Sequence, residues 1–178
     1  GSDFITGGGT VTNGMLVFMA LTPTYAGQQI DHPQLQGINI INVSALGSSA
    51  TNGMHAILVE NVYNFKAINV STYFCSHGLA LKGVGGQVEG LYAHGHGSDG
   101  LIIKGDTYAY AMGVSANNIY VTSIGSYDGG GISVSSISSD NYFSKITNFH
   151  IENTKFGVYA SSPSSRVDGL MLNNGSIV

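Results

Sequence analysis

The stretch ITNFHIENTKFGVYASS, residues 146–162, decides the fold because it holds two short apolar units separated by a turn. The first unit, NFHI at 148–151, and the second, GVYA at 157–160, each begin with Asn or Gly and continue as apolar, variable, apolar. A period of two places the apolar side chains on one face of a β-strand and the middle residue on the other. The stretch therefore predicts two half-buried strands joined by a turn.

Both units recur along the chain. Copies of the first are residues 37–40, 67–70, 90–93, 118–121, 148–151 and 169–172, and copies of the second are 53–56, 78–81, 100–103, 131–134 and 157–160. A third strand is expected between them at residues 59–65, 85–88, 141–146 and 165–167. Interleaved repeats of this kind predict an all-β coil of about three strands per rung, in which each strand pairs in parallel with its copy one rung away.

Composition agrees with one β-rich domain over residues 1–178. The chain is 43% hydrophobic and only 9% charged, which excludes a disordered chain. Six Lys and Arg and a net charge of -4 predict no nucleic-acid partner. The longest apolar run, residues 15–21, is too short for a bilayer span, so no membrane partner is expected.

The rungs at 146–162 and 167–178, preceded by NVYNFKAINVSTYFCSHGLALKG at 61–83, resemble the right-handed parallel β-helix of the pectate-lyase-like superfamily. The resemblance covers residues 34–178 and is closest in character to phage tailspike depolymerases and secreted polysaccharide-active proteins. It implies a polysaccharide partner and a location outside the cell or on a virion surface. The catalytic motifs of its polygalacturonases and pectate lyases do not match in order or spacing, so no catalytic role is carried over.

The two ends of the chain predict a piece of a longer protein. Solenoids need capped ends, and neither end of this sequence has a recognisable capping segment. Gly1 and Ser2 are typical of a cloning remnant. We therefore expect a β-helix domain excised from a longer chain, or one whose ends are covered by partner chains.

The densest polar cluster surrounds Asp99, which precedes a glycine as Asn52 and His77 do in earlier copies of the second unit. Asp128 lies in the next corresponding turn. Stacked side chains one rung apart would form an acid/base pair from Asp99 and Asp128, assisted by His77 or His96. The alternative is structural, because Asp and Asn ahead of Gly commonly bond the backbone of a turn.

The same cluster contains residue types that ligate metals. His94 and His96 alternate along one segment, and Asp99 follows closely. A structural or solvated role is favoured for these side chains, since the strand would have to continue past Ala93 to point both rings the same way. No metal and no other cofactor is therefore expected.

A second constellation is the outward column of the first unit. Its members are Asn39, Asn69, Tyr92, Tyr120, His150 and Met171. Tyr92, Tyr120 and His150 should stack along the axis and, with His94, bind a polysaccharide. The alternative is a stack that only stabilises the sheet or packs on another subunit. The charged residues nearby, including Glu152, are expected to be solvated or paired surface groups.

The sequence thus predicts extracellular polysaccharide recognition, with depolymerisation by hydrolysis or β-elimination as a further step. Whether the protein is an enzyme stays open, and an enzyme of this type would be a polysaccharide lyase or a glycoside hydrolase. One alternative is a non-catalytic glycan-binding or structural shaft of a homotrimeric fibre, and another is a trimer subunit whose site is formed between chains. A trimer shaft predicts that outward apolar residues such as Ile41 and Ile102 are exposed in one chain.

Overall fold

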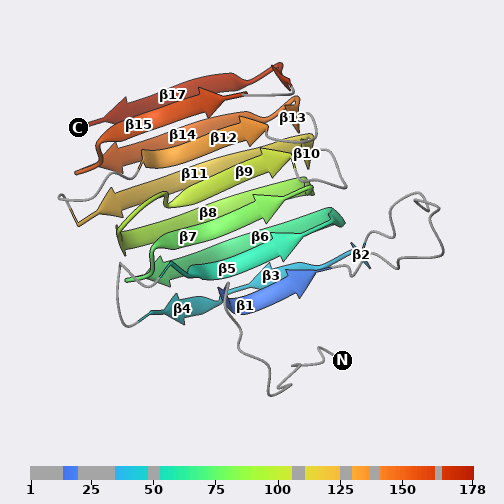
Figure 1. The fold of residues 1–178 in the computed structure, drawn as a ribbon, viewed down its shortest axis with the longest axis horizontal. Coiled ribbons are helices and arrows are strands. Elements are labelled where there is room, and N and C mark those ends of the chain that lie inside the picture. Colours follow the sequence, from blue (N-terminus) through green and yellow to red (C-terminus); the bar gives the residue numbers. More distant parts are fainter. Residues whose placement is uncertain are drawn as a thin grey trace.

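The computed structural model describes residues 14–19, 35–47, 53–105, 111–124, 130–136, 141–162 and 166–178. Within these ranges every regular element is a β-strand, and all pairings are parallel. The strands stack as a β-solenoid of about four turns (Figure 1). The predicted all-β parallel solenoid is therefore confirmed. No helix long and apolar enough to cross a membrane occurs in the part of the chain that the structure describes.

The solenoid has two large sheets and a small one. The front sheet of Figure 1 has the order β1 (Gly14–Met19), β5 (His55–Glu60), β7 (His77–Lys82), β9 (Leu101–Gly105), β12 (Gly130–Ser136) and β15 (Phe156–Ser161). The back sheet has the order β17 (Met171–Ile177), β14 (Lys145–Glu152), β11 (Val114–Ser123), β8 (Gly85–His96), β6 (Val62–Tyr73) and β2 (Leu35–Gln36), and β3 (Asn39–Ile41) and β4 (Ser44–Leu46) also pair with β6. The corner sheet contains β10 (Ala111–Met112), β13 (Asn141–Tyr142) and β16 (Val167–Asp168).

The predicted third strand is distinct only in the later rungs, where it forms the corner sheet. In the earlier rungs it is continuous with the back sheet, because β6 and β8 are single strands of 12 residues each. The rung therefore changes from two long strands to three shorter ones along the axis.

The core lies between the front and back sheets and consists of columns of apolar side chains. Ile57, Leu79, Leu101 and Ile132 are in register on the front sheet and fully buried. Val70, Leu91, Ile119 and Phe149 form the facing column on the back sheet. Parallel in-register stacking places like residues at one depth, which is why the alternation could be read from sequence.

The back-sheet strands bend at a column of residues with positive φ. These residues are Asn42, Asn69, Gly90, Asn118, Asn148 and Asn174. Asn and Gly enter this left-handed region more readily than other residues. A second such column, at the corner that precedes the back sheet, contains Gly37, Asn64, Gly113, Phe143 and Gly169.

The two columns of bend residues show that the copies of the first unit were aligned incorrectly in the sequence. Gly37 and Gly169 belong to the corner column, whereas Gly90, Asn118 and Asn148 belong to the bend within the sheet. Asn39 and Met171 therefore lie in the column of Lys66 and Lys145, and not in the column of Tyr92. Asn69 is itself a bend residue, and Ser71 takes its place beside Tyr92.

The first copy of the second unit was misaligned in the same way. Gly78, Gly100, Gly131 and Gly157 share a column, but their partner on the earlier rung is Ala56 and not Gly53. The residue that stacks on His77 is consequently His55, so the predicted column through Asn52 is wrong. Both misalignments arose because Gly is used wherever a bend or close approach requires it, not at one position of the rung.

Candidate functional site

Asp99, the central residue of the predicted acid/base group, lies in the turn between β8 and β9, and only 6% of its surface is exposed. Its Oδ1 accepts a hydrogen bond from the backbone N–H of Gly130 at 3.0 Å, and its Oδ2 accepts one from the Tyr159 hydroxyl at 3.2 Å. Burial raises the pKa of the Asp99 carboxyl, although both donors oppose that shift. With both oxygens engaged, Asp99 ties its own turn to the start of β12 on the next rung and to Tyr159 on β15.

His96, the last residue of the back-sheet strand β8, is completely buried. Its Nε2 lies 3.0 Å from the Thr72 hydroxyl and 3.2 Å from the Thr72 carbonyl, and its Nδ1 lies 3.2 Å from the Cys75 carbonyl. Burial lowers the pKa of His96. These contacts join consecutive rungs, so the ring acts as a polar bridge inside the fold.

His77 stacks on His55 one rung away, with ring centroids 4.7 Å apart. Burial lowers the pKa of His77 to about 4 and that of His55 to about 3. Asp128, the second carboxylate of the predicted pair, lies outside the described residues. The acid/base role of the pair therefore stays a prediction.

The predicted aromatic stack is present on the outer face of the back sheet. Tyr92 and Tyr120 stack with centroids 4.9 Å apart and an interplanar angle of 8°, and Tyr120 and His150 stack at 5.4 Å and 15°. His94 joins the stack on Tyr92 at 5.9 Å. The rings present their faces to one another, so mainly their edges and polar tips are open to solvent.

Glu152 completes this cluster, which we call the tyrosine ladder and define as Tyr92, His94, Tyr120, His150 and Glu152. The Tyr120 hydroxyl donates a short hydrogen bond to Glu152, and the His150 Nε2 lies 3.3 Å from the other carboxylate oxygen. The bond from Tyr120 lowers the pKa of Glu152 and raises that of Tyr120 to about 12. The sequence alone indicates only a solvated or paired surface group at Glu152, because its hydrogen-bond partner Tyr120 is 32 residues away in the chain.

Glu152→Gln should lower the pKa of Tyr120 from about 12 toward its ordinary value of 10, because it replaces the carboxylate that accepts the Tyr120 hydrogen bond and removes the nearby negative charge. Carbon-13 NMR of labelled tyrosine, followed through an alkaline titration, measures this pKa. Glu89→Gln is the matched control, since Glu89 is on the same face but accepts bonds from Asn117 and Asn118. An unchanged Tyr120 pKa in Glu152→Gln would show that the two groups do not interact in solution.

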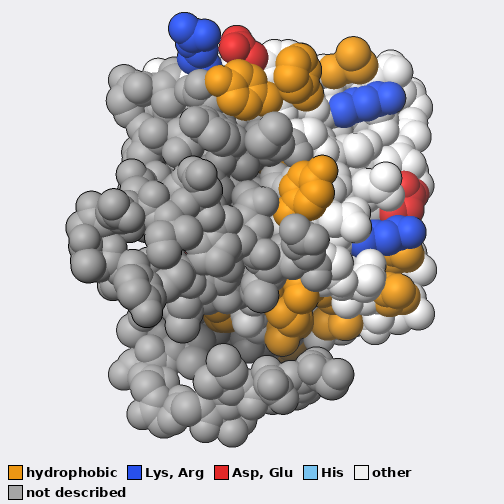
Figure 2. All heavy atoms as spheres, turned by 90° about the vertical axis from the view of Figure 1, so that its right-hand side faces the viewer, with side chains coloured by type: hydrophobic (Ala, Val, Ile, Leu, Met, Phe, Trp, Pro, Cys, Tyr) orange, Lys and Arg blue, Asp and Glu red, His pale blue; other side chains and the backbone are white. Residues whose placement is uncertain are grey.

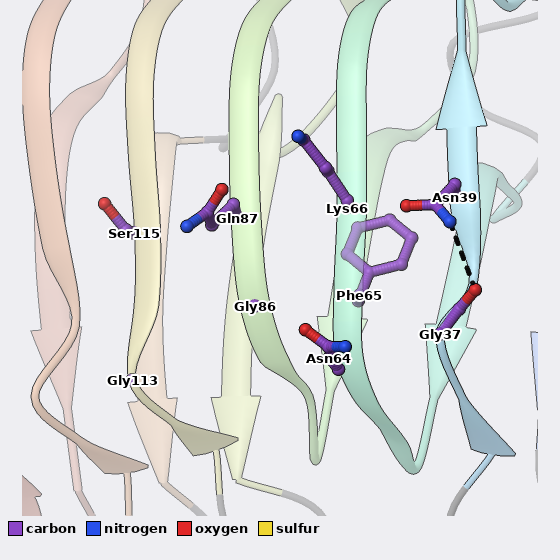
Figure 3. A pocket seen from close by; sticks show the side chains of 9 residues that line it. All are labelled: Gly37, Asn39, Asn64, Phe65, Lys66, Gly86, Gln87, Gly113 and Ser115. Atoms are coloured by element: carbon purple, nitrogen blue, oxygen red, sulfur yellow. Dashed lines mark hydrogen bonds between the residues drawn. The ribbon is translucent and has the colours of Figure 1, made fainter.

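A groove lies beside the ladder, at the start of the same strands, with a volume of about 430 Å³. It crosses four consecutive rungs and is lined by Gly37, Asn39, Asn64, Phe65, Lys66, Gly86, Gln87, Gly113 and Ser115. Asn39, Lys66, Gln87 and Ser115 form one outward column in register (Figure 3). The sequence missed this groove because its side chains are common polar types with no motif.

The charge of this surface is low. Viewed toward the corner, the described surface shows a few Lys, Arg, Asp and Glu side chains, with acidic and basic ones next to each other in this view, among uncharged polar and apolar ones (Figure 2). Within the described ranges, no group of three or more His, Cys, Asp and Glu side chains is arranged to hold a metal ion. Lys66 is the charged side chain among the residues that line the groove.

The chain was compared with protein families, curated proteins and solved structures. No family model, curated protein or solved structure matches the chain. The fold and the site therefore stand on the sequence and on the geometry alone.

Proposed function

We propose that this protein binds an extended glycan along the outer face of the back sheet, with its chain direction parallel to the solenoid axis. The observation that carries the proposal is the open groove of about 430 Å³ across four rungs. Its volume lies within the range of about 300–1,000 Å³ typical of small-ligand sites.

The chemistry of the lining suits sugar hydroxyl groups. Asn39, Asn64 and Gln87 offer amide donors and acceptors, Ser115 offers a hydroxyl, and Lys66 offers an ammonium group. Rungs repeat at about 4.8 Å, which is close to the length of one pyranose unit in an extended chain. Successive rungs can therefore contact successive sugars, each with one polar side chain of the column.

The glycines of the groove allow a ligand to approach the backbone. A Cβ atom at Gly37 or Gly113 would meet no atom within 4 Å, so the space above both residues is open. The N–H groups of Gly37 and Gly113 already donate to the carbonyls of Tyr63 and Tyr142, so the two glycines give the ligand room and not additional hydrogen bonds.

The tyrosine ladder supplies a second contact region on the same face. Because its ring faces are stacked on one another, sugars would meet the Tyr92 and Tyr120 hydroxyl groups, the His150 and His94 rings at their edges, and the Glu152 carboxylate. Tyr92 is 40% exposed, which leaves it accessible. The ladder thus contributes hydrogen bonds more than ring stacking.

Binding without cleavage is the activity that the described residues support best. Asp99 and His96 are buried and bonded within the protein, so neither is poised to protonate a glycosidic oxygen. Cleavage would need Asp128 or groups beyond the described residues.

The alternative of a trimer shaft has one observation in its favour. Ile41 and Leu46 at the first rungs of the back sheet are 52% and 65% exposed, as a covered interface would require. Ile102, the other residue named for such an interface, is only 8% exposed. Sedimentation velocity would report a trimer directly.

Gln87→Ala should weaken glycan binding about 5–10-fold, because it removes side-chain hydrogen bonds from the middle of the groove. Polysaccharides that bind the wild-type protein are first identified on a glycan array, and affinities are then measured by isothermal titration calorimetry. Asn173→Ala is the matched control, an exposed amide on the same face but on the terminal strand β17. Absence of binding to any polysaccharide, or equal weakening by both variants, would contradict the proposal.

A further inference from the structure

Phe143 is the most exposed aromatic residue in the described part of the chain. It lies at the corner between β13 and β14, with 73% of its surface exposed and a φ of 54°. A bulky residue with positive φ is uncommon, because its Cβ crowds the backbone. The other members of this corner column are glycines and Asn64, which adopt the conformation more easily.

Packing of the Phe143 ring against its neighbours offers little stabilisation to offset the unfavourable backbone conformation. Its ring lies over Gly169 on the next rung, where an added Cβ would come within 2.9 Å of the ring, and its centroid is 6.2 Å from that of Tyr142. Phe74 is the comparable case on the back sheet, but its ring packs edge-on against His94 at 5.7 Å and is 42% exposed. Exposed and strained side chains of this kind concentrate at functional positions.

The position of Phe143 relative to the groove suggests its use. Gly113 lines the groove, and its N–H donates to the carbonyl of Tyr142, the residue immediately before Phe143. Phe143 therefore occupies the same corner as Gly113, one rung farther along the axis. The next outward side chain of the groove column, Lys145, is in register with Ser115 and is also exposed.

We infer that Phe143 is an aromatic platform that stacks on the apolar face of one sugar ring and extends the glycan groove by one rung. The inference rests on the proposed function. Unlike the rings of the tyrosine ladder, this ring has no stacked partner on successive rungs among the described residues, so more of its surface is open to a ligand. Apolar contact between a sugar face and an aromatic ring, bordered by polar groups that bind hydroxyls, is the usual chemistry of such a subsite.

Three substitutions test the platform. Phe143→Asn should weaken binding of a long oligosaccharide about 10-fold, and Phe143→Leu should do nearly the same, because both remove the ring. Phe143→Tyr should retain the wild-type affinity. The midpoint of thermal unfolding should stay equal or rise in Phe143→Asn, since Asn accepts positive φ better than Phe.

The outcomes separate this inference from the proposed function. Calorimetry with the glycan identified for the wild type, together with thermal unfolding of each variant, gives the readouts. If Gln87→Ala weakens binding while Phe143→Asn and Phe143→Leu bind normally, the groove binds glycan and the platform is refuted. If Phe143→Asn lowers the unfolding midpoint without changing affinity, Phe143 is structural. If the wild-type protein binds no glycan, both the function and the platform fail.

Discussion

Lowering the pH from 7 to 4 should destabilise the fold by an amount on the order of 4 kcal/mol, with most of the loss below pH 6.5. The cause is the half-buried pair His55 and His77, whose pKa values are lowered from 6.5 to about 3 and about 4. The loss is smaller than the full shifts would give, because both rings are partly exposed. Urea unfolding followed by circular dichroism at several pH values measures it.

The sign follows from which state binds the proton more tightly. In the unfolded chain both histidines titrate near pH 6.5, whereas in the folded protein they stay neutral until the pH approaches 4 or 3. Their contribution to stability is therefore present above pH 6.5 and is lost as the pH falls toward the folded pKa values. His96 acts in the same direction, and the raised pKa of Asp99 opposes it.

The surroundings of the two imidazole rings also make protonation unfavourable in the folded protein. The Nδ1 atoms of His55 and His77 are buried and have no hydrogen-bond partner in the described part of the chain. A proton added there would create an unsatisfied buried charge beside a second imidazole, with Lys82 and, for His55, Lys104 adding repulsion.

The double substitution His55→Gln, His77→Gln should flatten the pH dependence, because neither amide titrates. His150→Gln is the matched control on the exposed face and should retain the wild-type profile. A double variant as acid-sensitive as the wild type would show that other groups govern acid unfolding.

Gly86→Ala should destabilise the protein by about 3 kcal/mol or more. A Cβ at Gly86 would lie 2.1 Å from the carbonyl oxygen and 2.8 Å from the carbonyl carbon of Phe65 on the neighbouring rung. Gly86 also has a φ of 158° and follows a register shift between β6 and β8. Because the obstructing atoms are backbone, two rungs would have to move apart to relieve the clash.

Gly37→Ala is the control for this prediction. Gly37 also has positive φ, at 71°, but its Cβ would meet nothing within 4 Å. Its loss of stability should be limited to about 1 kcal/mol, the conformational cost alone. Equal losses in the two variants, measured by urea unfolding at pH 7, would mean that the close contact of the rungs at Gly86 does not limit stability.

The stack of Tyr92, Tyr120 and His150 could be predicted from the sequence, because each residue lies two positions after a bend residue. It failed for Asn39 and Met171, since Gly and Asn produce positive φ at two different corners of the rung and look alike in the repeat. The groove and Phe143 were missed for a related reason. Their significance depends on exposure and on neighbours one rung away, not on residue type.

What the sequence determined by itself was the parallel solenoid, its inward columns and its aromatic stack. Those features follow from a period of two that recurs in every rung, although the rungs differ in length, because this period fixes the face of each side chain. Only the tertiary structure decided that Asp99 and His96 are bonded within the protein, that Tyr120 and His150 contact Glu152, and that a polar groove opens at the corner. These features depend on which atoms of neighbouring rungs come into contact. Those contacts are set by packing and by turns of unequal length, which the repeat pattern does not specify.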